Sequence, residues 1–597
     1  MSGQISLSLD RVLPFLPYLR SYTGGRLRLD LVAGLTVAIV ALPQSMAYAL
    51  IAGIDPRYGL YASIIPAILG SLFGSSRHLI TGPTNAISLV VLSTLAPHAD
   101  DPARMIALVF LLSLLVGGLQ LFFGLVRMGS LINFVSHSVI LGFMTGAGIL
   151  IAFNQIKNLL GIAIPRSHSF IATTWQTILH AGDTNVISLG LGVLTVILII
   201  GFQRKFPKLP AALLAMGISG AIVYIFDLAS QGVRVVGEIP RTLPPMSLPA
   251  LDLDSIRKMA PGALAIALLG AVEALSIARA ISSSSKQKID GSQEFIGQGL
   301  SNVGAAFFSG YPGSGSFTRS AVNFKAGGET PFAGAFSGLF VLLALLAFAP
   351  FAAYIPIPAL AGLLMIVAYS MVDRKQLALA YKATRTDRRV LISTGVATLL
   401  LDLEFAVLLG VLISIVLFLR KVSMPRVVNL IPDGKRKLRE LGSCDEMCPQ
   451  VMVAQAEGGL FFGSVSGFEE ALEHATRCHS TKVLNLRMKA VSMIDATGVH
   501  ALELLWEHLQ STGRELYLSG VSPDVRRVLA WSGFDKKIGE DHIVSSTHEA
   551  ILTFFRKHVN PEVCSACTLA VFKECPSAES RGETARSGAA AALLGCP

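Results

Sequence analysis

The chain has 597 residues, of which 52% are hydrophobic and only 15% are charged. A typical soluble protein carries about 25% charged residues. The composition therefore argues against a soluble multidomain protein, a disordered chain, a nucleic-acid-binding module and a disulfide-rich secreted scaffold. It predicts a polytopic membrane protein with a more polar part attached.

Charge and cysteine are distributed unevenly. Up to Lys421 the chain holds 30 Lys and Arg against 18 Asp and Glu, and the rest holds 19 against 21. The basic excess thus belongs to the apolar part, where it reports membrane topology rather than nucleic-acid binding. All seven cysteines lie at or after Cys444. An odd number, in a chain without a recognisable signal peptide, predicts reduced cytoplasmic thiols.

A membrane-spanning helix needs roughly 20 apolar residues. Eight stretches meet this requirement clearly: 30–52, 102–126, 184–203, 210–229, 258–281, 331–350, 355–372 and 404–420. Six are weaker or shorter: 59–76, 79–97, 130–156, 291–310, 314–325 and 389–402. We therefore expect a cytoplasmic N-terminal segment at 1–29, followed by a transmembrane domain of fourteen segments at 30–421.

Loop charge supports this count. With a cytoplasmic N-terminus and alternating segments, 21 Lys and Arg fall on the cytoplasmic side and 8 on the outer side. Cytoplasmic loops of membrane proteins carry an excess of basic residues. The sequence therefore predicts that both termini lie in the cytoplasm.

The third and tenth segments differ from the others. They open with polar runs rich in Gly and Pro, at 81–85 and 311–316, through which a helix cannot continue unbroken. Broken segments in matching positions of two halves indicate a 7+7 inverted repeat with a binding site near the middle of the bilayer. The alternative is that these residues only kink two ordinary spans.

After Lys421 the pattern changes to strands alternating with helices. Strands are predicted at 451–456, 460–463, 483–486 and 516–518, and helices at 468–476, 498–509, 525–531 and 548–559. This order predicts a small α/β domain at 440–560. Residues 561–597 are small and polar, and we expect them to be disordered.

Two charged residues lie deep in apolar segments, Glu273 and Arg319. A charge at the bilayer centre costs at least about 2.5–3.5 kcal/mol, so such residues face a cavity or each other. They are interpreted as a carboxylate that carries a proton or binds a cation and an arginine that attracts an anion. The alternative is a static ion pair. Glu273 is the only carboxylate deep in a clear span.

Hydroxyl groups at Thr84, Ser316 and Thr318 stand where two helix N-termini are expected, and they could donate hydrogen bonds to an oxyanion. Gln44 and Tyr48 lie four residues apart on one face of the first span and should also face the cavity. Hydrogen bonding between helices is their alternative role.

The C-terminal cysteines form a Cys-x-x-Cys pair, Cys564 and Cys567, with Cys575 beyond it. A zinc site needs four ligands, and Cys596 or His558 could complete the set. We expect free thiols and no metal site, because the segment looks unstructured. The absence of nucleotide-binding and hydrolase motifs in usable context predicts no cofactor and no enzyme activity.

The run Pro56-Arg57-Tyr58-Gly59-Leu60-Tyr61-Ala62-Ser63, which continues to Gly74-Ser75-Ser76-Arg77, resembles the signature of the SulP anion permeases. Residues 41–49 and 318–323 resemble further segments of this family, and the likeness covers about residues 10–560. It implies fourteen helices in an inverted repeat, a moving core domain, a gate domain and a homodimer. By this likeness, Gln44, Tyr48, Ser316, Phe317, Thr318 and Arg319 match positions that line the substrate site.

The same resemblance places Glu273 at the acid that serves proton coupling in plant-type sulfate importers. Sodium-coupled bicarbonate members are less similar here, because they typically carry Asp at this position and lack an arginine at 319. The polar domain resembles a STAS domain, shared with bacterial anti-sigma-factor antagonists. Their phosphorylated hydroxyl falls on Thr497, within Asp495-Ala496-Thr497-Gly498. Helix capping is the alternative role of this motif.

Taken together, the sequence predicts a proton-coupled sulfate importer of a bacterial inner membrane. The partners expected are a small inorganic anion, protons, the lipid bilayer, a second copy of the chain and a cytoplasmic protein at the STAS domain. The first alternative is transport of bicarbonate, a dicarboxylate or another anion by symport or exchange. An anion channel or a membrane-tethered signalling scaffold is the alternative from a different functional class.

Overall fold

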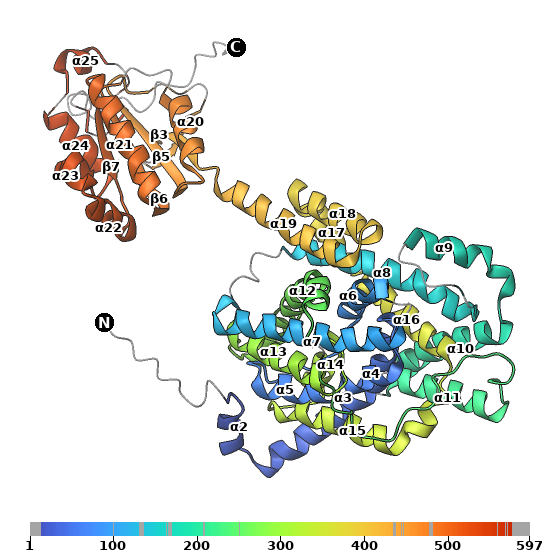
Figure 1. Ribbon diagram of the computed structural model, residues 1–597. Helices are drawn as coiled ribbons and strands as arrows, with labels where there is room; N and C mark the ends of the chain where they lie inside the picture. Colours follow the sequence, from blue (N-terminus) through green and yellow to red (C-terminus); the bar gives the residue numbers. More distant parts are fainter. Residues whose placement is uncertain are drawn as a thin grey trace. The chain divides into compact units, whose positions relative to one another are not determined.

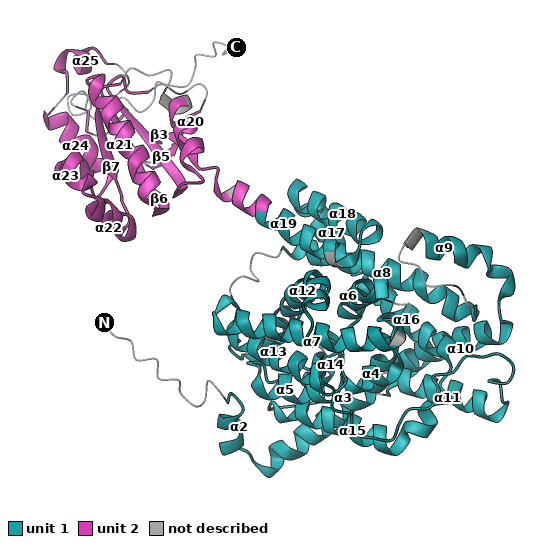
Figure 2. Ribbon diagram, viewed as in Figure 1, with its two compact units in different colours: residues 1–415 teal, residues 416–597 magenta. Residues whose placement is uncertain are grey.

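The computed structural model describes residues 13–98, 101–129, 136–162, 164, 170–206, 209–249, 251–433, 437–442, 445, 447–476, 481–557, 559–567, 569, 571–572 and 574–575. The chain divides into two compact units, Met1–Ile415 and Val416–Pro597 (Figure 2). Each is described by itself. The first is built from helices, and the second combines a sheet with helices (Figure 1).

Every predicted span coincides at least in part with a helix. In chain order the helices are α2 (Leu16–Arg20), α3 (Gly24–Ile51), α4 (Pro56–Tyr61), α5 (Ile65–Phe73), α6 (Asn85–Leu95), α7 (Pro102–Leu125), α8 (His137–Leu160), α9 (Phe170–Leu179), α10 (Val186–Lys205), α11 (Ala211–Ile225), α12 (Leu253–Ser285), α13 (Gly291–Phe307), α14 (Phe317–Lys325), α15 (Phe332–Ala352), α16 (Ile357–Met371), α17 (Arg374–Ala383), α18 (Arg385–Leu400) and α19 (Leu403–Val422). Helices α2, α9 and α17 lie outside the predicted spans.

The second predicted span, 59–76, consists of two helices. Helix α4 ends at Tyr61, and α5 starts at Ile65 with Pro66 in its first turn. Proline is accommodated in a first turn but not in a helix interior. The span predicted at 59–76 is therefore not one continuous helix, and the position of Pro66 explains the break.

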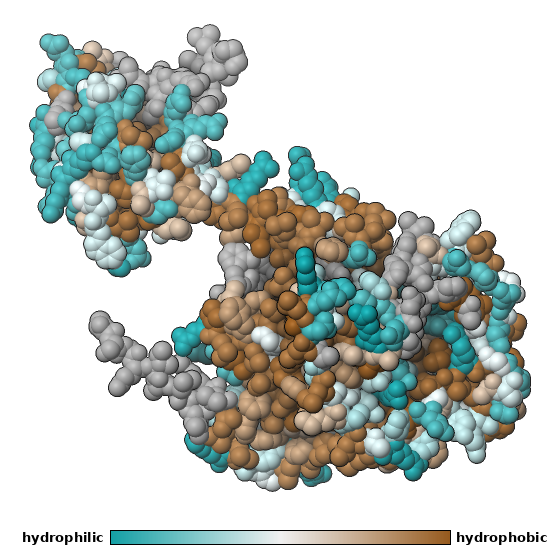
Figure 3. Space-filling view, in the orientation of Figure 1, coloured by the Kyte–Doolittle hydropathy of each residue, from teal (hydrophilic) through white to brown (hydrophobic). Residues whose placement is uncertain are grey.

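By length and composition, seven helical stretches of the described chain could cross a membrane: α3, α7, α8, α10, α12, α15 and Ile357–Ala383. Helices α6 and α11 and the stretch Phe405–Arg420 of α19 are apolar but shorter. On the face shown in Figure 3, hydrophobic residues cover much of the first unit, whereas hydrophilic residues are frequent on the second. The unit therefore has the composition of a membrane domain, and the number of fourteen segments stays a prediction.

The helices of the first unit pack in two groups. Helices α3, α5, α7, α12, α13 and α15 contact one another extensively, and so do α8, α10, α16 and α18. Two short strands, β1 (Thr81–Gly82) and β2 (Ser314–Gly315), pair antiparallel, with Thr81 opposite Gly315. They belong to the third and tenth predicted segments. Antiparallel pairing between matching positions of the two halves agrees with an inverted repeat.

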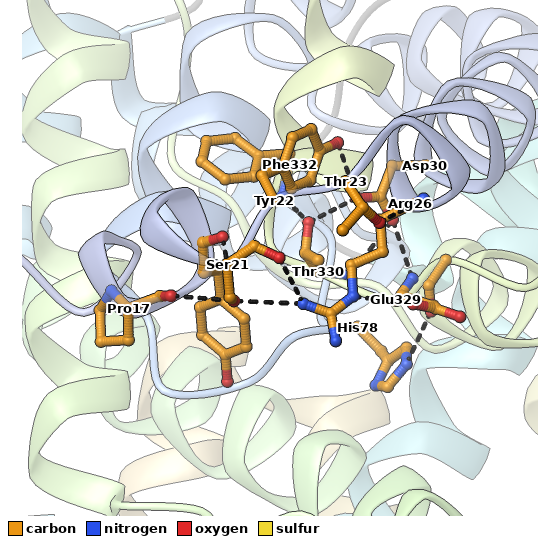
Figure 4. Close-up of polar contacts among 12 residues, drawn as sticks. Pro17, Ser21, Tyr22, Thr23, Arg26, Asp30, His78, Glu329, Thr330 and Phe332 are labelled. Atoms are coloured by element: carbon orange, nitrogen blue, oxygen red, sulfur yellow. Dashed lines mark hydrogen bonds and ion pairs between the residues drawn. The ribbon is translucent and has the colours of Figure 1, made fainter.

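A buried carboxylate joins α3 to the turn before α15. Asp30 is fully buried, and its Oδ1 accepts hydrogen bonds from the backbone N–H groups of Glu329 (2.8 Å) and Thr330 (3.1 Å). Its Oδ2 accepts hydrogen bonds from the hydroxyls of Thr330 (2.5 Å) and Tyr22 (3.0 Å) (Figure 4). Arg26 adds an ion pair to Glu329 at 3.3 Å. All four donors thus depend on one side chain.

Replacing Asp30 by alanine should destabilise the protein, because it leaves two backbone N–H groups without an acceptor in a dry environment. Each buried unsatisfied donor costs about 1–3 kcal/mol. The matched control is Asp373→Ala, which removes an exposed cap of α17 whose donors water can satisfy. Thermal unfolding of the detergent-solubilised protein should show a clearly larger loss of Tm for Asp30→Ala. Equal losses would contradict this account of Asp30.

The second unit contains a six-stranded sheet of order β4-β3-β5-β6-β7-β8. The strands are β3 (Arg426–Pro432), β4 (Leu438–Glu440), β5 (Val451–Leu460), β6 (Val483–Ile494), β7 (Glu515–Ser519) and β8 (Ile543–Val544). β5 to β8 are parallel, and β3 is antiparallel to both β4 and β5. The helices are α20 (Val465–Thr476), α21 (Ala496–Ser511), α22 (Pro523–Ser532), α23 (Phe534–Ile538), α24 (Thr547–Lys557) and α25 (Pro561–Ala566).

The α/β prediction for this unit is confirmed, with differences in detail. Only one strand forms there, because β5 covers 451–460 and passes Gly458 with an irregular register, whereas residues 461–463 of the second predicted strand form a bend and a turn. The sheet begins at Arg426, ahead of residue 440, because Leu430 and Ile431 are buried against the core.

The prediction that the tail at 561–597 is disordered is wrong for its first part. Residues 561–566 form α25, and Phe572 and Cys575 are buried in the same cluster as Phe554. Two apolar side chains are enough to anchor a segment that is otherwise small and polar. Residues 576–597 lie outside the described residues.

Candidate functional site

The two broken segments meet at the centre of the first unit, where each strand leads into a helix. Thr84 caps α6 by accepting a hydrogen bond from the backbone N–H of Ile87 at 3.4 Å. Ser316 caps α14 in the same way, with Arg319 N–H as the donor at 3.5 Å. Its own N–H donates to the carbonyl of Ile80 at 2.8 Å. Two positive helix ends therefore start beside one pair of strands.

Arg319 is the largest fully buried side chain of the unit, with 1% of its surface exposed. Its guanidinium donates to the Ser45 hydroxyl at 3.1 Å, the Ser63 hydroxyl at 3.3 Å and the carbonyl oxygen of Pro83 at 3.3 Å. All three acceptors are neutral, and Nε is buried without a hydrogen-bond partner. Among the described residues no carboxylate pairs with it. A buried cation held only by neutral groups creates a strong positive potential.

Gly82 of β1 explains how the guanidinium fits. A Cβ added at this residue would lie 2.5 Å from the Arg319 Nη1 atom. Any residue with a Cβ at this position would push the guanidinium out of its observed place. The absence of a side chain at Gly82 therefore lets the strand pass directly over the guanidinium of Arg319.

Substituting alanine for Gly82 should displace Arg319 and impair transport. Overpacking of this kind typically costs about 1–3 kcal/mol. The matched control is Gly118→Ala in α7, because a Cβ at Gly118 meets nothing within 4 Å. We expect initial uptake rates in proteoliposomes to fall at least several-fold for Gly82→Ala and to stay near wild type for the control. A normal rate for Gly82→Ala would show that the position of the guanidinium does not matter.

Glu273 of α12 contacts the segment that follows β1. The hydroxyl of Thr84 donates to its Oε2 at 3.2 Å, and the side chain of Ser314 lies within hydrogen-bonding range. No ion pair between Glu273 and Arg319 is present in the described part of the chain. A static pair therefore does not explain the presence of these two charges inside the membrane unit. Tyr48 of α3 is buried and lies within electrostatic range of both.

The other predicted site residues are placed less uniformly. Gln44 is buried one turn before Tyr48, and its Oε1 has no hydrogen-bond donor, so this amide could still accept one. Phe317 and Thr318, in the first turn of α14, are exposed, and 61% of Phe317 is accessible. They face away from the interior that holds Arg319. The structure thus brings Tyr48, Thr84, Glu273, Ser316 and Arg319 to the strands and leaves Phe317 and Thr318 at a surface.

Sequence reasoning missed several polar residues here. Ser45, Ser63 and Ser314 hold the two charges, and Tyr311 bonds the hydroxyl of Ser88 at 2.9 Å within range of Arg319. Small hydroxyl residues in apolar spans are a weak signal, since many of them only bond their own helix.

Glu273, which is half-buried, is also not the only carboxylate inside the membrane unit. Besides Asp30, Glu294 of α13 is buried, and its Oε2 accepts hydrogen bonds from Ser75 N–H (2.9 Å), Ser75 Oγ (2.8 Å) and Ser76 N–H (3.1 Å). These contacts fix the segment after α5. Glu294 lies in one of the weaker predicted spans, where a charge does not stand out from the sequence.

In the second unit, Asp495 is the cap of α21. Its Oδ1 accepts a hydrogen bond from Gly498 N–H at 2.9 Å, and its Oδ2 accepts one from Phe462 N–H at 3.0 Å. Thr497 does not cap the helix and is exposed in its first turn. Within the described ranges, no group of three or more His, Cys, Asp or Glu side chains could hold a metal ion. His558 and Cys596, named above as possible zinc ligands, lie outside those ranges.

Comparison with known proteins agrees with this architecture. Residues 27–394 match the Sulfate permease family, and residues 445–550 match the STAS domain. The chain is 33% identical to the putative sulfate transporter YvdB of Bacillus subtilis, over 88% of this chain and 97% of that protein. It is 31% identical to the chloroplastic sulfate transporter 4.1 of Arabidopsis thaliana, over 91% and 82% of the two chains.

Two solved structures extend the comparison. The fold is similar to that of murine Slc26a9 in an inward-facing state, with a TM-score of 0.86, 21% identity and coverage of 93% and 96%. The transmembrane domain of the cyanobacterial bicarbonate transporter BicA matches with a TM-score of 0.58 and 28% identity, over 66% of this chain and 98% of that domain. With a family match over more than half of the chain and a relative matched along nearly its whole length, this protein belongs to the sulfate permease family, a family of transporters rather than enzymes.

Proposed function

We propose that the protein imports sulfate across a bacterial inner membrane, driven by protons and operating by alternating access. The observation that carries the proposal is the buried guanidinium of Arg319, which has only neutral partners among the described residues. A cation in that position lacks a counter-ion, and a transported anion would supply one. Two helix N-termini at the same strands add to the attraction for an anion.

The remaining groups are assigned by their chemistry. Thr84 and Ser316 carry hydroxyls at the two helix starts, and Gln44 and Tyr48 of α3 are polar groups that would line the anion's path. Phe317 and Thr318 would contribute from the exposed first turn of α14. Glu273 would carry a proton, because its oxygens are held by hydroxyl groups and by no cation among the described residues. No cofactor is required for this cycle.

Sulfate is preferred over bicarbonate for two reasons. The two relatives compared above, each matched over more than four fifths of its own length, are named sulfate transporters. By resemblance, bicarbonate members also lack an arginine at the position of Arg319. The likeness to BicA keeps bicarbonate as the second candidate.

Uptake of radiolabelled sulfate into proteoliposomes tests the proposal, with unlabelled sulfate, bicarbonate, chloride and succinate as competitors. Competition by sulfate alone is the expected result. Strong competition by bicarbonate would favour the second candidate. Currents far above carrier turnover would indicate a channel, and no flux of any anion would favour a signalling scaffold.

We further propose a homodimer with both termini in the cytoplasm, as the loop charges indicate. The exposed hydroxyl of Thr497 would be available for phosphorylation, and a cytoplasmic partner would bind the STAS domain. A phosphate at the start of α21 would be favoured by the helix dipole. Phosphorylation of Thr497 would therefore change the surface without unfolding the domain.

Removing the STAS domain should leave the membrane unit inserted but lower its abundance or turnover, provided that the truncation removes the whole six-stranded sheet. A truncated chain that ends at residue 424 lacks every strand of the six-stranded sheet. A chain that ends at residue 439 keeps β3 without β5 and so exposes Leu430 and Ile431. Unpaired apolar strands promote aggregation. Gel filtration of the two truncations should therefore show more aggregate for the longer one. If both transport at the full rate and level, the domain is dispensable.

A further inference from the structure

A cavity lies at the end of the membrane unit where α3 finishes. It has a volume of about 940 Å³. Its walls come from both helix groups: the end of α3 and the start of α4 on one side, and the last turns of α8 and the end of α18 on the other. None of Tyr48, Thr84, Glu273, Ser316 and Arg319 lines it. We call this cavity the vestibule.

Charged residues from distant parts of the sequence meet in the vestibule. Arg57, Lys157 and Arg234 line it, together with Asp55 and Asp402. Arg57 is partly neutralised, because its Nε lies 3.7 Å from Asp55 Oδ2. All three basic residues belong to segments that the loop charges place on the outer side of the membrane. The vestibule is therefore a basic cavity on the side from which an imported anion would arrive.

Arg234 is the least compensated of these charges. Its Nη2 donates to Asn158 Oδ1 at 3.3 Å and to the carbonyl oxygen of Ile162 at 3.4 Å, both neutral. In the described ranges no carboxylate contacts it. The Arg234 side chain is exposed, and the protein atoms around its guanidinium remove part of its hydration, which lowers its pKa. An arginine that lines the vestibule, is accessible to solvent and has only neutral partners among the described residues is suited to an exchangeable anion.

Neutral amide side chains line the vestibule near Arg234. Asn158 Nδ2 donates to Gln155 Oε1 at 2.9 Å, and both side chains line the vestibule beside Arg234. A guanidinium can offer two parallel N–H groups to an oxyanion, and amide groups add further donors. This combination fits a tetrahedral or planar oxyanion better than a halide ion, which accepts hydrogen bonds without a preferred direction.

We propose that the vestibule contains a second oxyanion-binding site, centred on Arg234 and Lys157, which binds inorganic sulfate before it reaches Arg319 beside β1 and β2. The inference rests on the proposed function and extends it to a two-site path. Because the walls come from both helix groups, an anion bound here would contact parts that must move relative to each other during alternating access.

Equilibrium binding of radiolabelled sulfate to the purified full-length protein tests the site without turnover. At low ionic strength the wild type should bind two sulfates per chain, Arg234→Gln one, and Arg234→Gln combined with Arg319→Gln none. A stoichiometry of one that depends on Arg319 and not on Arg234 would overturn the inference. Absence of sulfate uptake by the wild type would count against the proposed function alone, because this binding is read independently.

Transport kinetics separate a binding role from a structural one. Arg234→Gln should raise the KM for sulfate about 5- to 10-fold and leave kcat unchanged, as expected for lost binding before the translocation step. Arg234→Lys should restore most of the affinity, because the charge is kept, whereas a role in holding Asn158 and Ile162 would not be rescued. The control is Arg241→Gln, an exposed arginine that does not line the vestibule. An unchanged KM for Arg234→Gln, or equal effects of Arg241→Gln, would contradict the site.

Discussion

Replacing Arg319 by alanine should weaken the apparent affinity for sulfate by roughly 10- to 100-fold and leave the protein inserted in the membrane. A hydrogen bond to a charged group is worth about 1.5–3 kcal/mol, and each 1.4 kcal/mol is a factor of ten. Arg319 is buried beneath Gly82 with neutral partners only among the described residues, so its charge is available to an anion at the strands. Initial rates of sulfate uptake over a range of concentrations give this affinity.

Three further variants identify the source of the effect. Arg319→Lys keeps the charge but cannot reach Ser45, Ser63 and Pro83 together, so it should recover only part of the affinity. Ser316→Ala and Thr318→Ala should have smaller effects, because each removes a neutral donor worth about 0.5–1.5 kcal/mol. Wild-type affinity and rate in Arg319→Ala would exclude the arginine from anion binding.

Replacing Glu273 by glutamine should abolish concentrative, pH-driven uptake while sparing sulfate binding and exchange. Glutamine imitates the protonated acid and cannot release a proton. The energetic reason is large, because importing a divalent anion against 100 mV costs about 4.6 kcal/mol, or ~2.3 kcal/mol per charge. Each co-transported proton cancels one charge and adds about 1.4 kcal/mol per pH unit of gradient. Without a proton carrier the cycle should run outward at equal concentrations.

The matched control for this prediction is Glu294→Gln. Glu294 is buried in the same unit, but it accepts hydrogen bonds from Ser75 and Ser76 after α5 and not from the residues around β1 and β2. Its substitution should reduce the yield of folded protein, whereas each folded molecule should still accumulate sulfate in response to pH. The comparison is uptake at external pH 5.5 and 7.5 with equal amounts of folded protein. A Glu273→Gln protein that accumulates sulfate with the wild-type pH dependence would remove Glu273 from the coupling mechanism.

Much of the fold could be predicted because hydrophobicity is a local property of the sequence. Each predicted span contains a helix, and the Gly/Pro-rich runs predicted the two breaks at 81–85 and 311–316 correctly. What the sequence did not show is how the breaks meet. Pairing of Thr81 with Gly315 is a contact between residues more than 200 positions apart, which no local pattern encodes.

The two charged residues of the candidate site could be identified from the sequence, but the hydroxyl groups that contact them could not. Glu273 and Arg319 stand out because a charge in an apolar span is expensive. Ser45 and Ser63 do not stand out, since only the folded structure brings both to the same guanidinium. The tail was misjudged for a related reason, because the burial of Phe572 and Cys575 depends on a cluster formed by residues such as Phe554 and Val544.

Sulfate accumulation by the wild-type protein in proteoliposomes is the most direct test of proton-coupled import. The measurement compares external pH 5.5 with 7.5 at a fixed internal pH of 7.5 and an interior-negative potential, with and without sodium. The proposed function predicts accumulation above the external concentration at pH 5.5, little at pH 7.5 and no effect of sodium. Uptake that requires sodium and ignores the pH difference would contradict proton coupling and favour a bicarbonate-type transporter.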